Sequence, residues 1–336
     1  MNDKIKEDLT AMEKKLSLYV EKGRVPGSAE VREEPMIAVK PNLESIRPLR
    51  KMSSFGGQFL AVDCSTRTLK RANNWGIYLM RVTYTALEKR NINWGYMERI
   101  CSAVGDAHTR SNYLTDFRIE LESQMALNLL QSGKIVYYED PRSNYLLIDG
   151  GGYFGGERKF RVSLYEECKK RGVNLLAISK NSPLLHDEKG RDFVATTSIL
   201  SPFGIWVYHP IRKANKDQSL YGDISLIKLC EESHRIFRCD IMDYLTEREV
   251  NELLSPLTST SEDPRCMGYP IVLWLAHEFS APSESMLLHY HDLIVTELDT
   301  AGLLDVLRRE ELACSFVDEL HGVRYAYERE HWSEYV

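Results

Sequence analysis

Residues 58–65 read QFLAVDCS, and residues 145–152 read YLLIDGGG. Each stretch is a short apolar run with β-branched or aromatic residues, which predicts a buried strand. Each run ends on an aspartate. A carboxylate at the end of a strand is held rigidly at the edge of a core, where it is partly dehydrated but still accessible, as a hard cation requires. Asp63 and Asp149 are therefore the first candidate metal ligands.

A third acid lies on a helix between these two strands. The pattern predicts a helix over 111–131 with Ser111 as its N-cap. The buried stripe of this helix is expected to contain Leu114, Phe117, Leu121, Met125 and Leu129. Glu122 lies beside that stripe, whereas Glu120 lies on the more polar side, so geometry favours Glu122 and leaves Glu120 as the alternative.

Three carboxylates from strand, helix and strand can hold one or two divalent ions. Such ions stabilise the attacking water and the leaving oxygen of a phosphodiester. The arrangement is the one expected of a metal-dependent nuclease of RNase H-like fold.

The remaining elements predict an α/β protein with a mixed sheet, in which strands alternate with helices before a helix-rich end. Further strands are predicted at 75–87, 92–103, 134–138, 173–178, 193–198 and 205–208. Further helices are predicted at 3–22, 157–171 and 270–298, the last with a break at Pro282. We expect an N-terminal helix and extended connector over 1–55, followed by one nuclease domain with a C-terminal helical part over 56–336.

The overall charge excludes one class of DNA-binding protein. The chain has 336 residues and a net charge of −6, so the global basic signature of a passive DNA-coating protein is absent. An enzyme needs only a local basic surface. The best candidate for steering phosphate is the set Arg67, Lys70 and Arg71, close after Asp63.

Cysteine usage and hydropathy favour a cytoplasmic protein. There are seven cysteines, and no pair has CxxC spacing, which argues against a zinc site or a disulfide framework. No apolar run approaches the roughly 20 residues of a membrane span. The N-terminal sequence also lacks the apolar stretch of a signal peptide.

The glycine-rich segment after Asp149 offers a different function. Residues 150–155 read GGGYFG and satisfy GxGxxG between a predicted strand and a predicted helix, so a dinucleotide-dependent oxidoreductase is an alternative. Two details weaken it. Asp149 would lie next to the pyrophosphate, and the following strand ends Ile178-Ser179-Lys180, without the acid that binds the ribose of NAD.

Several short motifs, in order, resemble the NurA nucleases, the partners of the hexameric DNA-pumping ATPase HerA. The likeness extends from about residue 56 to residue 295. It is carried by FLAVDCS at 59–65, RIELE at 118–122, LIDG at 147–150, AISK at 177–180 and GYP at 268–270 with LAH at 275–277. The sequence departs from the family pattern where Cys64 replaces the usual glycine, in the long spacer between Glu122 and Asp149, and in the glycine run after Asp149.

The resemblance implies an RNase H-like fold with added helices and a homodimer that uses Mn²⁺ (or Mg²⁺). It implies degradation of DNA ends from the 5′ side and internal cutting of single strands, on single-stranded DNA and double-stranded ends, in DNA end resection with a HerA-type ATPase. A catalytically inactive docking subunit of a DNA translocase is the alternative within the same fold.

Three further residues are expected to assist the acids. His277 would act as an acid, a base or a phosphate-orienting group, because imidazole titrates near neutral pH. Tyr269, eight positions before it, would steady a phosphate or the water. Lys180, at the end of a strand, would neutralise the scissile phosphate.

Overall fold

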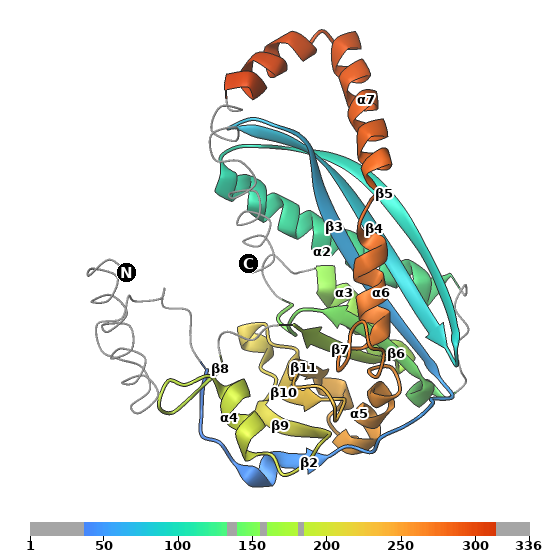
Figure 1. Ribbon diagram of the computed structural model, residues 1–336, viewed down its shortest axis with the longest axis vertical. Coiled ribbons are helices and arrows are strands. Elements are labelled where there is room, and N and C mark those ends of the chain that lie inside the picture. Colours follow the sequence, from blue (N-terminus) through green and yellow to red (C-terminus); the bar gives the residue numbers. More distant parts are fainter. Residues whose placement is uncertain (1–36, 133–139, 155–159, 181–184, 314–336) are drawn as a thin grey trace, which may run out of the picture. The chain divides into compact units, whose positions relative to one another are not determined.

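The structure is a computed structural model that describes residues 37–132, 140–154, 160–180 and 185–313 (Figure 1). The predicted helix at 3–22 and the predicted strand at 134–138 lie outside these residues. Within the described part of the chain, no helix is long and apolar enough to cross a membrane.

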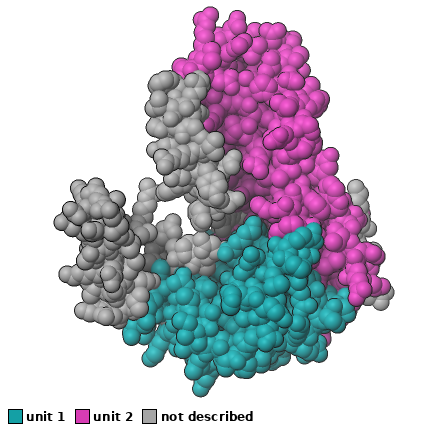
Figure 2. All heavy atoms as spheres, viewed as in Figure 1, with its two compact units in different colours: residues 1–55, 149–152, 176–270 teal, residues 56–148, 153–175, 271–336 magenta. Residues whose placement is uncertain are grey.

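The chain forms two compact units, which Figure 2 distinguishes by colour. Unit 1 consists of residues 1–55, 149–152 and 176–270, and unit 2 consists of residues 56–148, 153–175 and 271–336. Both units are therefore assembled from separated stretches of sequence. The division at residue 55 that the sequence suggests remains a prediction about domains.

Nine strands are hydrogen-bonded in the order β2-β9-β10-β11-β7-β6-β3-β4-β5. Their bounds are β2 Ile46–Pro48, β3 Gln58–Arg71, β4 Trp75–Glu88, β5 Asn91–Val104, β6 Asn144–Asp149, β7 Asn174–Ser179, β9 Trp206–Arg212, β10 Gly222–Lys228 and β11 Phe237–Met242. β3 and β6 are parallel, and β3 and β4 are antiparallel, so the sheet is mixed. The predicted α/β class, with a large mixed sheet flanked by helices, is confirmed.

Unit 2 is built on the long antiparallel strands β3, β4 and β5, with the shorter β6 parallel to β3. Its helices are α2 Ala107–Gln131, α3 Phe160–Arg171, α6 Ile271–Ser280 and α7 Glu284–Thr300. α2 and α6 both pack against β3 and β4, and they cover opposite faces of these strands (Figure 1). Alternate residues of β3 therefore point to different helices, which separates Asp63 from Cys64. The buried residues between these layers include Ala61, Leu79 and Leu121.

Unit 1 contains the antiparallel strands β2, β9, β10 and β11 and most of β7. A separate two-stranded sheet pairs β1 Ile37–Val39 with β8 Leu185–Asp187. The α-helices of unit 1 are α4 Phe193–Leu200 and α5 Val250–Thr258. Short 3-10 turns lie at Leu43–Ser45, Lys216–Gln218 and Asp243–Leu245.

The strand that carries Asp63 is longer than predicted. β3 does not end at Asp63 but continues to Arg71, because β4 folds back on it and pairs with it from Gln58 to Arg71. The shorter partner, β6, pairs with β3 only from Gln58 to Val62. Asp63 is therefore the first residue of β3 beyond that parallel ladder, while Asp149 does end its strand as predicted.

One helix prediction and one strand prediction were also wrong. α2 begins at Ala107 rather than 111, because the side chain of Asp106, not Ser111, accepts a hydrogen bond from the amide of Thr109 at 2.7 Å. Residues 193–198 form part of α4 instead of a strand. Asp192 caps this helix by accepting a hydrogen bond from the Ala195 amide at 2.8 Å, which outweighs the strand preference of its valine, threonines and isoleucine.

The break at Pro282 is confirmed. α6 ends at Ser280 and α7 begins at Glu284, with Ser283 as its N-cap. A proline cannot supply the amide that a continuous helix would need there. His277 therefore lies in the last turn of α6.

Candidate metal and catalytic site

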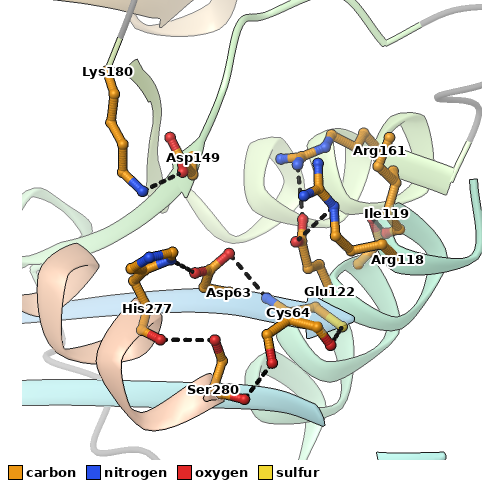
Figure 3. Close-up of polar contacts among 12 residues, drawn as sticks. Asp63, Cys64, Arg118, Ile119, Glu122, Asp149, Arg161, Lys180, His277 and Ser280 are labelled. Atoms are coloured by element: carbon orange, nitrogen blue, oxygen red, sulfur yellow. Dashed lines mark hydrogen bonds and ion pairs between the residues drawn. The ribbon is translucent and has the colours of Figure 1, made fainter. Parts of the chain in front are cut away.

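In unit 2, Asp63 forms a close pair with His277. Asp63 is buried at 7% exposure. Its Oδ2 lies 2.8 Å from Nδ1 of His277, and its Oδ1 accepts a hydrogen bond from the amide of Cys64 at 2.9 Å (Figure 3). The His277 side chain is 45% exposed. Because Nδ1 faces the carboxylate, a proton exchanged with a substrate or water would pass through Nε2.

The end of α6 is tied to β3 near this pair. Ser65 Oγ donates a hydrogen bond to the carbonyl of Ser280, and Ser280 Oγ donates one to the carbonyl of His277 at 2.8 Å. These bonds join the turn of α6 that carries His277 to the strand that carries Asp63 (Figure 3). They fix the imidazole with respect to the carboxylate.

Also in unit 2, Glu122 is buried at 8% exposure and faces basic side chains. Its Oε2 accepts a hydrogen bond from a guanidinium nitrogen of Arg161, on α3, at 2.9 Å. Nε of Arg118 lies 3.9 Å from its Oε1. Glu120, in contrast, is half-buried and accepts a hydrogen bond from Gln124 at 2.9 Å. Of the two glutamates that the sequence leaves open, Glu122 is the one in the interior.

The thiol of Cys64 responds to both unit 2 acids. Burial raises the pKa of this thiol well above its usual range, and the charges of Glu122 and Asp63 raise it further. The charges of two buried carboxylates therefore both affect the Cys64 thiol. The oxygens of these carboxylates are ligands preferred by Mg²⁺ and suited to Mn²⁺.

In unit 1, Asp149 forms an ion pair with Lys180. Nζ of Lys180 lies 3.1 Å from Oδ2 of Asp149, and the two side chains are 45% and 31% exposed (Figure 3). Nζ also lies 6.0 Å from the centre of the buried ring of Tyr269. The three predicted site residues of unit 1 thus lie around one ammonium group.

Each of the three acids therefore lies beside a side-chain nitrogen: Asp63 beside the His277 imidazole, Glu122 beside the Arg161 guanidinium and Asp149 beside the Lys180 ammonium. Across residues 37–132, 140–154, 160–180 and 185–313, no group of three histidine, cysteine, aspartate or glutamate side chains is arranged to hold a metal ion. The donor chemistry nevertheless fits an oxygen-liganded divalent ion. Such an ion would replace part of the positive charge that the basic partners now provide.

The proposed phosphate-steering residues lie towards the far end of β3. Lys70 is buried, and its Nζ pairs with Oε2 of Glu311 at 3.0 Å, so its charge is already balanced. Arg67 and Arg71 are half-buried. Lys70 is consequently a weaker candidate for a phosphate contact than the sequence indicates.

Some residues of the site had no strong sequence signal. The spacing of four residues on a helix could have linked Arg118 to Glu122. Arg161 is 39 positions from Glu122, and only the packing of α3 against α2 brings them together. Arg238 and Asp240, which contact the glycine segment after Asp149, were likewise not recognised.

The backbone amide of Gly152 is not available to bind a pyrophosphate. That amide donates a hydrogen bond of 2.7 Å to Oδ2 of Asp240, a fully buried carboxylate. The amide that a dinucleotide fold would offer to a phosphate is thus already bonded within the protein. This contact argues against the oxidoreductase alternative.

Comparison with known proteins gives a consistent result for the fold. No family model and no curated protein matches the sequence. Among solved structures, the NurA nuclease from Sulfolobus solfataricus is similar with 15% identity and a TM-score of 0.60, over 90% of this chain and 98% of that one. A NurA structure with manganese is similar with 10% identity and a TM-score of 0.51, over 86% of this chain and 98% of that one. The chain therefore has the fold of the NurA nucleases.

Proposed function

We propose that this chain is a divalent-metal-dependent deoxyribonuclease of the NurA family. The observation that carries the proposal is the pair of buried carboxylates, Asp63 and Glu122, each held by a basic side chain, in a chain with the NurA fold. Buried charges are costly to a fold and are concentrated at functional sites. The motif order along the sequence supports the same assignment.

Asp63, Glu122 and Asp149 are the proposed ligands of one or two Mn²⁺ (or Mg²⁺) ions. The parallel ladder of β3 and β6 supports this choice, since its last pair is Val62 with Ile148 and the next residue of each strand is an aspartate. A bound ion would polarise the phosphodiester and lower the pKa of an attacking water. The manganese in one NurA structure supports this choice of metal.

The other residues act on the substrate directly. His277, oriented by Asp63, exchanges a proton through Nε2 with water or with the leaving oxygen. Lys180 neutralises charge on the scissile phosphate, and Tyr269 steadies the phosphate or the water. Lys180 also lines an open hollow of about 380 Å³, together with Ser179, Asp192 and Ser198. Arg67 and Arg71, with Lys70 as the weaker member, remain the proposed steering residues on β3.

The test is cleavage of end-labelled linear DNA in the presence of Mn²⁺, Mg²⁺ or EDTA. We expect cleavage with Mn²⁺, none with EDTA, and a loss of more than about 100-fold in Asp63→Asn and Glu122→Gln, since even outer-shell partners of a metal are worth 10–100-fold. Glu120→Gln should keep its activity if Glu122 is the ligand. Cleavage that persists in EDTA would overturn the proposal. Metal-dependent DNA binding without cleavage would favour the inactive docking subunit.

The finer features of the proposal come from the family resemblance. We propose that the enzyme is a cytoplasmic homodimer that degrades DNA ends from the 5′ side and cuts single strands internally. We also propose that it works with a HerA-type hexameric ATPase in DNA end resection. Substrates labelled at either end, sedimentation of the purified protein and co-purification with such an ATPase test these features separately.

A further inference from the structure

The three glycines after Asp149 form an anchored turn in unit 1. Gly150 has a φ of 105°, which disfavours other residues, and its amide donates to the carbonyl of Ile178 at 3.2 Å. The carbonyl of Gly152 accepts a hydrogen bond from the amide of Tyr221 at 2.9 Å. The backbone that leaves Asp149 is thus held at both ends of the turn.

A buried ion pair lies directly against this turn. Asp240, on β11, is 0% exposed, and Arg238 is 7% exposed. Nε of Arg238 donates to Oδ1 of Asp240 at 2.7 Å, and a terminal nitrogen donates to Oδ2 at 2.6 Å. Oδ2 also accepts the amide of Gly152 at 2.7 Å. A bidentate arginine–carboxylate pair has a fixed geometry, so it defines the position of the Gly152 amide that Asp240 binds.

This contact leaves little room for a side chain at Gly152. A Cβ on Gly152 would lie 3.1 Å from Oδ2 of Asp240, and a Cβ on Gly151 would lie 3.4 Å from a terminal nitrogen of Arg238. A side chain at Gly152 would need the turn or Asp240 to move by a few tenths of an ångström, whereas the distance at Gly151 is that of an ordinary contact. Within the glycine run, which departs from the family motif and resembles a dinucleotide loop, Gly152 is therefore explained by close packing on Asp240 and Gly150 by its positive φ.

We propose that Arg238 and Asp240 are positioning residues for Asp149. They bind no substrate in this role. They hold the turn from Gly150 to Gly152, and the turn fixes the backbone from which the Asp149 carboxylate projects towards the metal. The inference rests on the proposed function, in which Asp149 is a metal ligand. An anchored turn removes the free-energy cost of ordering that ligand when the metal binds.

The first experiment measures Mn²⁺ binding by isothermal titration calorimetry, without DNA. In Asp240→Asn the side chain keeps its size but loses its charge, so the contact with Gly152 is weakened. We expect the dissociation constant for Mn²⁺ to rise 10–100-fold, as for other groups that orient metal ligands. At saturating Mn²⁺, kcat should recover most of its value and KM for DNA should not change.

Asp223→Asn is the matched control. Asp223 is also a buried aspartate, at 6% exposure, on the neighbouring strand β10, and it accepts an amide hydrogen bond, from Ala214 at 2.8 Å. No hydrogen bond of the described residues links it to the glycine turn. Its substitution should leave Mn²⁺ binding unchanged. An equal loss in both variants would show that any buried carboxylate of unit 1 has this effect, and would overturn the inference.

Gly152→Ala tests the same idea without removing either charge of the ion pair. Its new methyl group should displace the turn by a few tenths of an ångström and weaken Mn²⁺ binding in the same direction, so it decides the question if Asp240→Asn does not fold. Wild-type Mn²⁺ affinity in either folded variant would overturn the role of Arg238 and Asp240. Absence of metal-dependent cleavage by the wild-type protein, in contrast, would overturn the proposed function itself.

Discussion

Removing the positive charge beside Glu122 should destabilise the metal-free protein far more than the metal-loaded one. Arg161 donates to Glu122 at 2.9 Å, and the two side chains are 7% and 10% exposed. Arg161→Met removes the guanidinium but keeps much of the apolar stem. It leaves a buried carboxylate whose other basic neighbour, Arg118, is 3.9 Å away.

Breaking a buried ion pair from one side costs about 3–5 kcal/mol, because the remaining charge is left uncompensated. Arg118 compensates in part, so we take the lower end, about 3 kcal/mol. For a unit of this size, 1 kcal/mol corresponds to a shift of about 2–4 °C, which gives a decrease in Tm of about 6–12 °C. A bound Mn²⁺ would itself neutralise Glu122, so the decrease should be at most about half as large in saturating Mn²⁺.

The assay is differential scanning calorimetry of both proteins in EDTA and in Mn²⁺. The double variant Glu122→Gln, Arg161→Met removes both charges and should be more stable in EDTA than Arg161→Met alone. That variant should also lose most of the stabilisation by Mn²⁺. The same decrease in Tm with and without Mn²⁺ would refute the reasoning that Glu122 and Arg161 form a charge-balanced metal ligand.

Three further predictions concern single residues. His277→Gln should lower kcat by about 100-fold or more at saturating Mn²⁺ with little change in Mn²⁺ affinity, because it removes a proton-transfer group rather than a ligand; steady-state kinetics with titrated metal would separate the two effects. Burial lowers the pKa of His209, so below the unfolded-state value of about 6.5 the unfolded chain binds a proton that the folded chain does not. Stability should therefore fall as pH drops from about 6.5 until the folded pKa is passed, and urea unfolding of His209→Gln should show a flatter pH dependence. Burial raises the pKa of the Cys64 thiol well above its usual range, so native protein at pH 8 should resist alkylation at Cys64, as mass spectrometry before and after denaturation would show.

The sequence by itself determined much of the sheet and the position of Asp149. The apolar runs at β6 and β7 predict buried strands within a residue or two of their observed bounds, because a buried strand needs consecutive apolar residues and little else. Pro282 predicts the break between α6 and α7 through the loss of one amide. These signals are local, so they can be recognised without knowing the partner of any segment.

Other features depend on residues far away in the sequence. β3 continues past Asp63 because its hydrogen-bond partner, β4, is equally long, and a strand's own sequence does not state the length of its partner. The residues of α4 favour a strand locally, whereas the cap at Asp192 and the packing of the segment favour a helix.

The charge balance of the site was decided by tertiary structure alone. Asp63 and His277 are 214 positions apart, Glu122 and Arg161 are 39 apart, and Asp240 is 88 positions from the Gly152 amide that it binds. A buried carboxylate needs a positive or hydrogen-bonding partner, but the sequence does not specify which of its basic residues will be brought close. The acids could therefore be selected from sequence patterns, whereas their partners, and the reason for the glycines after Asp149, depend on the contacts made when the chain folds.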